Sequence, residues 1–163
     1  MDNIKKTPKM VAALTEEEIQ AIEKFYSAWK KQQLELLDEV CTADWKDIPL
    51  APNQEDGPKG LQKIMKQLIG LFPDIEIVIH EIFGTHERAG VRASLEFTQN
   101  SEVLGIPATN RKVSIALHEF HHLKDGKLTH TWHLEDWFGL LMQSGAWQTN
   151  GFANDGLEDN TLL

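Results

Sequence analysis

The chain has 163 residues, of which 41% are hydrophobic and 25% charged, a composition that suits one globular domain with a single core. Its net charge of −9 argues against a nucleic-acid partner or an anionic membrane surface, because phosphate groups are bound by clustered basic side chains. No apolar run approaches the ~20 residues that span a bilayer, and no signal-peptide core follows the N-terminus, so a cytoplasmic protein is expected.

The first ordered element is expected to be a helix that begins after Thr15. Thr15 and Glu18 have the spacing of a capping box, in which each side chain accepts from the backbone N–H of the other residue. Apolar residues then recur at helical spacing up to Trp29, so one face of this helix is expected to be buried. A shorter helical pattern covers residues 34–41, and the stretch after it, "ADWKDIPLAPNQEDG", is expected to be irregular.

A third helix is expected after Gly57, because Pro58 suits the first helical turn, where its missing N–H has no helical partner. This helix carries an apolar stripe and ends at "FPD". From Ile75 on, apolar residues alternate with period two, which is typical of half-buried strands in an antiparallel sheet. The last two of four such segments are separated by "KDGK", in which Asp-Gly is a hairpin signal.

Helices that precede an antiparallel sheet indicate the α+β class. A curved, mainly antiparallel sheet folded over the N-terminal helices would enclose a pocket lined from both sides. The single domain is expected over residues 14–147, between a flexible arm at 1–13 and an acidic, mobile tail at 148–163. Cys41, the one cysteine, is expected to be a small buried residue, since alone it can form neither an intrachain disulfide nor a zinc site.

A dense group of histidines near the end of the chain first suggests a metal site. Metal ligands must converge on one point, whereas strand alternation divides these histidines between two faces, and no HExxH or CxxC motif is present. We therefore expect no metal, and most of the group to be solvated or packed near strand ends. Five of the seven histidines are in this group: His118, His121, His122, His130 and His133.

An acid/base pair is the better interpretation of the same segment. Leu117 lies on the inward face of its strand, and Glu119 and His121 continue that face in steps of two. The Asp-Gly turn then places His133 of the last strand opposite Glu119, on the pocket side. A carboxylate that accepts from one imidazole nitrogen leaves the other nitrogen to take a proton. A buried His–Glu pair that meets no substrate is the alternative.

Several short motifs follow one another over residues 15–147. They are a helix that ends in Phe72-Pro73-Asp74, a G-x-P-x-T-x-R segment from Gly105 to Arg111, Asp125-Gly126-Lys127, then Trp132 and Asp136, and a closing G-L-L-x-Q-x-G from Gly139 to Gly145. Each motif is weak alone, and their combination is fairly specific. In their order and spacing they resemble those of the SnoaL-like polyketide cyclases, also called ester cyclases.

The resemblance implies a cone-shaped α+β barrel, as in nuclear transport factor 2, ketosteroid isomerase and scytalone dehydratase, with a deep pocket and a homodimeric assembly. Members of the family close a polyketide ring by an intramolecular aldol reaction without metal or cofactor. Their acid/base is an aspartate on the last strand, helped by a histidine on the preceding strand and by an asparagine or histidine after the second helix. In this sequence these three positions are matched by His133, Glu119 and Asp47, so the carboxylate and the imidazole have exchanged strands.

The expected activity is cofactor-free acid/base chemistry on a small hydrophobic carbonyl compound, in which removal of a proton α to the carbonyl leads to cyclisation or isomerisation. His133 is the expected base and Glu119 its orienting partner. Asp136 and Asp47 are further catalytic candidates. The substrate-binding candidates are Trp45, Phe97, Leu117, His121 and Trp132. Two alternatives stay open: a non-catalytic ligand-binding or dimeric interaction module on the same fold, and another pocket reaction such as epoxide hydrolysis or dehydration.

Overall fold

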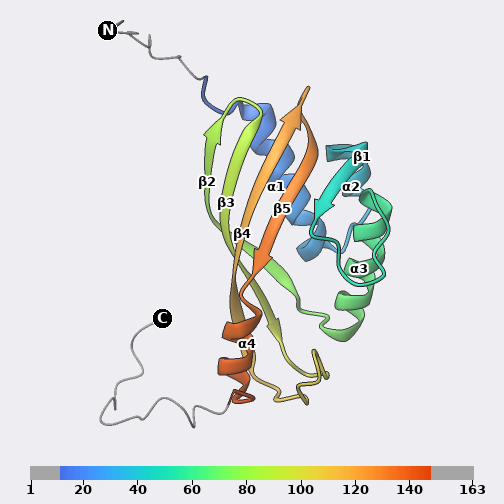
Figure 1. Ribbon diagram of the computed structural model, residues 1–163, viewed down its shortest axis with the longest axis vertical. Helices are drawn as coiled ribbons and strands as arrows, with labels where there is room; N and C mark the ends of the chain where they lie inside the picture. Colours follow the sequence, from blue (N-terminus) through green and yellow to red (C-terminus); the bar gives the residue numbers. More distant parts are fainter. Residues whose placement is uncertain (1–11, 148–163) are drawn as a thin grey trace, which may run out of the picture.

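A computed structural model describes residues 12–147 and shows helices packed on a five-stranded sheet (Figure 1). The elements in chain order are α1 (Glu16–Lys31), α2 (Leu36–Val40), β1 (Cys41–Ile48), α3 (Pro58–Leu71), β2 (Glu76–Thr85), β3 (Arg88–Thr98), β4 (Lys112–Lys124), β5 (Lys127–Glu135) and α4 (Trp137–Ser144). Of the expected N-terminal arm, only the last two residues are described, and the expected tail at 148–163 lies outside the described residues.

The predicted α+β class is confirmed. The strands are ordered β1-β5-β4-β3-β2, and every junction is antiparallel except the parallel one between β1 and β5. The sheet is curved, α1 crosses one of its faces, and α2 and α3 lie near its β1 edge (Figure 1). No helix within residues 12–147 is long and apolar enough to cross a membrane.

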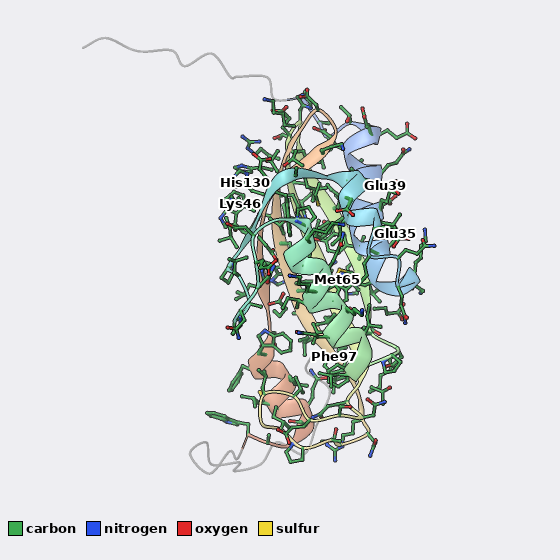
Figure 2. The ribbon with its side chains drawn as sticks, turned by 90° about the vertical axis from the view of Figure 1, so that its right-hand side faces the viewer. Glu35, Glu39, Lys46, Met65, Phe97 and His130 are labelled. Atoms are coloured by element: carbon green, nitrogen blue, oxygen red, sulfur yellow. The ribbon has the colours of Figure 1, made fainter. Side chains whose placement is uncertain are left out.

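Strand alternation sets the inward face of the sheet as the sequence predicts. In Figure 2, Met65 of α3 and Phe97 of β3 lie in the interior, whereas Lys46 and His130 lie side by side on the outer side, in agreement with their pairing in the ladder. The capping box at the start of α1 is also present. The buried inward residues of β3 and β4 include Ala89, Val91, Ala93, Leu95, Phe97, Val113, Ile115, Leu117, Glu119 and His121.

The β4–β5 hairpin forms at the predicted turn. Asp125 and Gly126 have φ angles of 50° and 71°, the left-handed conformation that a two-residue type I′ turn requires at both central positions. Glu119 pairs directly with His133 in the ladder, as expected. The one register shift of this hairpin lies close to the turn, so the two faces of β5 from His130 onward are those predicted from alternation.

The prediction of an irregular stretch at residues 43–57 was wrong for its first part and is confirmed for residues 49–57. Residues 43–48 belong to β1, and Cys41, which is buried as expected, begins this strand instead of ending a helix. A register shift between Cys41 and Lys46 interrupts the alternation of the two faces, and position 47, which faces inward, carries a carboxylate. The sequence therefore lacks the alternating apolar residues by which a strand is predicted. This strand is held in the sheet by parallel pairing with β5. Because β5 is far along the chain, the residues around β1 carry no local signal of this pairing.

Candidate active site

Three of the four predicted catalytic residues lie together on the inward face of three adjacent strands. Glu119 on β4 is the cross-strand partner of His133 on β5, and Asp47 lies on β1, which flanks the other side of β5. His133 Nε2 is 3.4 Å from Asp47 Oδ1. Asp47 and Glu119 are only 6% and 7% exposed, whereas the His133 side chain is 18% exposed. The cluster is therefore open to solvent at His133 and closed behind it.

Both ring nitrogens of His133 face oxygen atoms. Nε2 lies 2.8 Å from the carbonyl oxygen of Pro49, which can only accept, so Nε2 carries a proton. Nδ1 lies 2.9 Å from Glu135 Oε1. Burial disfavours the charged ring, but the Glu135 hydrogen bond and the nearby carboxylates outweigh it and raise the pKa of His133 to about 9. At neutral pH the ring is an imidazolium that donates from both nitrogens.

Glu119 bonds to a helix residue instead of to its strand neighbour. The Tyr26 hydroxyl donates to Glu119 Oε2 at 2.5 Å, and no ion pair within 4.0 Å joins Glu119 to His133 in the described part of the chain. The orienting bond expected between these two residues is thus replaced by bonds from His133 to Pro49 and Glu135. Burial raises the pKa of Glu119 to about 8, against the opposing effects of the Tyr26 hydrogen bond and the His133 charge.

The loop after β1 closes the cluster from the side. Gln54 donates to Asp47 Oδ2 at 2.7 Å, and Pro49 of the same loop supplies the carbonyl at His133. Burial raises the pKa of Asp47, while the Gln54 bond and the His133 charge act in the opposite direction. Glu135, a partner of His133 that was not among the predicted site residues, could have been found from the sequence. It lies two residues after His133 on β5, so both side chains point to the same face of the sheet. Gln54 and the Pro49 carbonyl lie in an irregular loop that carries no such signal.

Asp136, the fourth catalytic candidate, lies outside this cluster. It is exposed and caps the N-terminus of α4, where its Oδ1 accepts from the Gly139 N–H at 2.8 Å. It follows the last residue of β5, so its side chain does not share the face of His133. The helix that it caps was not predicted.

Four of the five substrate-binding candidates face inward, and they are tightly packed. Trp45, Phe97, Leu117 and His121 are between 0% and 2% exposed. Trp132 lies on the outer face, where its ring stacks on His130 and meets His122 edge-on. Successive side chains of a strand point to opposite faces of the sheet, so His133 points inward and Trp132 outward, and the two residues cannot line one inner wall.

The outer face of the sheet carries an apolar groove of about 550 Å³. Phe83, Phe120 and Leu134 on its lining are 52%, 59% and 72% exposed, and Trp132 lies beside them. A more polar hollow of about 830 Å³ lies toward the β4–β5 turn. Within residues 12–147, no group of three or more His, Cys, Asp or Glu side chains is arranged so that it could hold a metal ion.

Comparisons with known proteins point to one family. The family model of the SnoaL-like polyketide cyclases matches residues 19–144. A proposed polyketide cyclase from Bacillus cereus has a TM-score of 0.70 and 25% identity, covering 91% of this chain and 99% of its own. No curated protein matches the chain.

Two structures from Streptomyces show the same fold at lower identity. TsrD from Streptomyces laurentii has a TM-score of 0.73 and 24% identity, with 82% of this chain and 99% of its own covered. IdmH, a proposed polyketide cyclase from Streptomyces antibioticus, has a TM-score of 0.70 and 22% identity, with 78% and 98% covered. These likenesses concern the path of the backbone, so roles of single residues rest on the geometry described above.

Proposed function

Because the chain belongs to the SnoaL-like polyketide cyclase family, we propose that it is a cofactor-free enzyme that removes a proton α to a carbonyl group of a small hydrophobic substrate. The observation that supports this most is the cluster of Asp47, Glu119 and His133, in which a buried carboxyl with a pKa of about 8 lies next to an imidazolium. A general base works best when its pKa lies near the working pH, and burial brings Glu119 into that range.

The geometry favours an exchange of the two catalytic roles expected from the sequence. A base needs a free lone pair, and both nitrogens of His133 face acceptors. We therefore assign the base to the Glu119 carboxylate and the stabilisation of the enolate oxygen to the His133 N–H at Nε2. The substrate oxygen would take the place of the Pro49 carbonyl at this nitrogen. A cationic donor directed at a developing oxyanion lowers the barrier more than a neutral one.

The proposed reaction is balanced without a further reactant. Glu119 takes the α-proton, and the electron pair of the broken C–H bond forms the enolate. In a ring closure the enolate carbon attacks a second carbonyl of the same molecule, and the proton on Glu119 passes to the new alkoxide. In an isomerisation the same proton returns to another carbon of the substrate.

Proton exchange tests this proposal without knowledge of the natural substrate. Aryl methyl ketones such as acetophenone would be incubated with the protein in D₂O, and loss of the α-proton signal followed by NMR. We expect Glu119→Gln and His133→Ala to slow the catalysed exchange by about 100-fold or more, the usual contribution of a general base or oxyanion donor. His130→Ala, the same change on the outer face, is the matched control. Full exchange in both site variants would refute the proposed roles.

A non-catalytic ligand-binding module is the second candidate, and one observation favours it. The inward walls formed by Trp45, Phe97 and Leu117 are packed like a core, with 0%, 1% and 2% exposure. A substrate would need the loop that carries Pro49 and Gln54 to move aside. If the ketones bind, as shown by shifts of amide signals around the cluster, but exchange no protons above the background rate, the binding module is the better description.

We also propose that the protein is a homodimer that assembles through the outer face of the sheet. Exposed apolar patches on soluble proteins commonly mark interfaces, and Phe83, Phe120 and Leu134 form such a patch around the outer groove. Glu81 and Arg92 lie on the same lining and pair with each other within the chain at 3.4 Å, so charge at this patch is balanced and does not oppose the approach of a second copy related by a twofold axis. Leu134→Asp should lower the mass measured by light scattering to that of a monomer, whereas Leu104→Asp, at an equally exposed leucine elsewhere, should not. A monomeric parent protein would disprove the assembly.

A further inference from the structure

A continuous chain of hydrogen bonds runs through the core behind Glu119. Trp45 Nε1 lies 3.0 Å from Thr131 Oγ1, which lies 3.0 Å from His121 Nδ1. His121 Nε2 lies 2.8 Å from Tyr26 Oη, which in turn donates to Glu119 Oε2 at 2.5 Å. These five side chains, here called the buried relay, come from α1, β1, β4 and β5, and none is more than 7% exposed. Water is therefore poorly placed to replace a bond that is lost.

The chemistry of Trp45 fixes the direction of the buried relay. An indole N–H can only donate, so Thr131 Oγ1 accepts from Trp45 and keeps its own proton to give. When Thr131 gives this proton to His121 Nδ1, the single proton of a neutral ring must lie on Nε2. That N–H then donates to Tyr26 Oη, and the Tyr26 hydroxyl is left to donate to Glu119. Every bond is satisfied in this order, and the chain ends on a carboxylate oxygen.

The opposite order leaves a buried proton without an acceptor in the buried relay. If Tyr26 donated to His121 Nε2, the ring would carry its proton on Nδ1 and donate to Thr131. Thr131 Oγ1 would then accept from both His121 and Trp45, and its own hydroxyl proton would have no partner within the relay. An unsatisfied buried hydroxyl costs on the order of 1–3 kcal/mol, so the order that ends on Glu119 is preferred.

We infer that Trp45, Thr131, His121 and Tyr26 are positioning residues, which form a one-way relay of hydrogen bonds that holds Glu119 Oε2 as an acceptor and favours the ionised form of this carboxyl. The inference deepens the proposed function, since it explains how a carboxylate so deeply buried can act as the base. It differs from the expected role of His121, which was a contact to substrate.

The ionisation of the groups around the relay agrees with this order. Burial lowers the pKa of His121 to about 3, so the ring is neutral and holds one proton. Burial and the Glu119 charge raise the pKa of Tyr26 well above its usual value, so its hydroxyl stays protonated. The other titratable groups that act on Glu119 are His133 and Glu135 from β5 and Asp47 from β1. Its partner on β3 is Val91, which does not titrate.

The test is an NMR titration of the unmodified protein and three variants, with no substrate present. At a pH above the titration of Glu119, the ¹⁵N shifts of His121 should show the tautomer with the proton on Nε2. Tyr26→Phe should move the titration midpoint of the Glu119 carboxyl, read from its ¹³C shift, upward by about one pH unit, because it removes the charge-assisted hydrogen bond from the Tyr26 hydroxyl. Thr131→Val, which removes the donor to His121 Nδ1, should weaken the preference of the His121 ring for the Nε2 tautomer. Thr129→Val, a matched change on the same strand but outside the relay, should leave both the midpoint and the tautomer unchanged.

Two results would overturn the inference. The first is a His121 ring with its proton on Nδ1 in the unmodified protein, since Tyr26 would then donate away from Glu119. The second is an unchanged Glu119 midpoint in Tyr26→Phe. The tautomer measurement needs no variant, so a variant that does not fold cannot leave the question open. Since neither readout involves turnover, the relay and the proposed reaction can fail independently.

Discussion

The charge state of His133 makes the stability of the protein depend on pH in a defined direction. The pKa of this ring is raised to about 9 in the folded protein, from an ordinary value of 6.5. A raised pKa means that folding favours the protonated form, so the stabilisation is fully present below pH 6.5 and is lost as the pH rises through 9. The difference of 2.5 pH units corresponds to about 3 kcal/mol. The ring is only 18% exposed, so screening by solvent removes little of this amount.

The assay compares urea unfolding of the parent protein and His133→Gln at intervals between pH 6 and pH 10. Since groups distant from His133 titrate alike in both proteins, the difference between the two curves reports on His133 together with the carboxyls on which its charge acts. We expect the parent to lose about 3 kcal/mol more than the variant across this range. His130→Gln serves as the control, because this histidine lies on the outer face. If the free energies of unfolding of the parent and His133→Gln change with pH in parallel, the ring is not held as an imidazolium. The proposed role of His133 in stabilising the enolate oxygen would then be refuted as well.

Three further outcomes follow from the site and its surroundings. The rate of ketone proton exchange should show a bell-shaped dependence on pH, rising as the carboxyl of Glu119 ionises near pH 8 and falling as His133 loses its proton near pH 9. Because the two groups interact, these two pKa values belong to the pair. A rate independent of pH would contradict both roles. Asp136→Ala should lower the free energy of unfolding by about 1 kcal/mol, because α4 loses its N-terminal cap, and should leave the rate of ketone proton exchange unchanged. Loss of this exchange in a folded variant would make Asp136 a catalytic candidate again. Leu117→Ala should cost about 2–5 kcal/mol in unfolding experiments if this side chain is packed as core, and a cost well below that range would indicate an open pocket wall.

Under the proposed function, the site departs from the pattern that the family resemblance implies by an exchange of carboxylate and imidazole between two strands. That implied pattern has an aspartate on the last strand and a histidine on the strand before it. Here the imidazole of His133 is on the last strand and has carboxylates on both sides, Asp47 and Glu135, which hold it charged. The carboxyl of Glu119 is on the inner strand, where burial makes it basic. Two groups with complementary charge states remain, and in the proposed reaction their roles are reversed.

The amino-acid sequence was sufficient to predict the elements whose signal is local. The capping box of α1, the start of α3 after Gly57 and the Asp125-Gly126 turn each depend on a few neighbouring residues, and each is found in the structure. The alternation of β3 and β4 also predicted which residues are buried. Because the turn fixes the register of the hairpin, it was possible to predict that Glu119 and His133 lie opposite each other.

The tertiary structure alone decided which atoms these side chains contact. Register places two Cα atoms side by side, but a carboxylate or an imidazole bonds to whichever donor or acceptor the rest of the fold brings within about 3 Å. For Glu119 that group is Tyr26 on a helix from the other end of the chain, and for His133 it is the Pro49 carbonyl on a loop without periodicity. Burial and neighbouring charge, which shift the two pKa values to about 8 and about 9, likewise arise only once distant segments are packed together. Hence the sequence determined the face on which the site residues lie, and the packing of the fold determined which of them can take a proton.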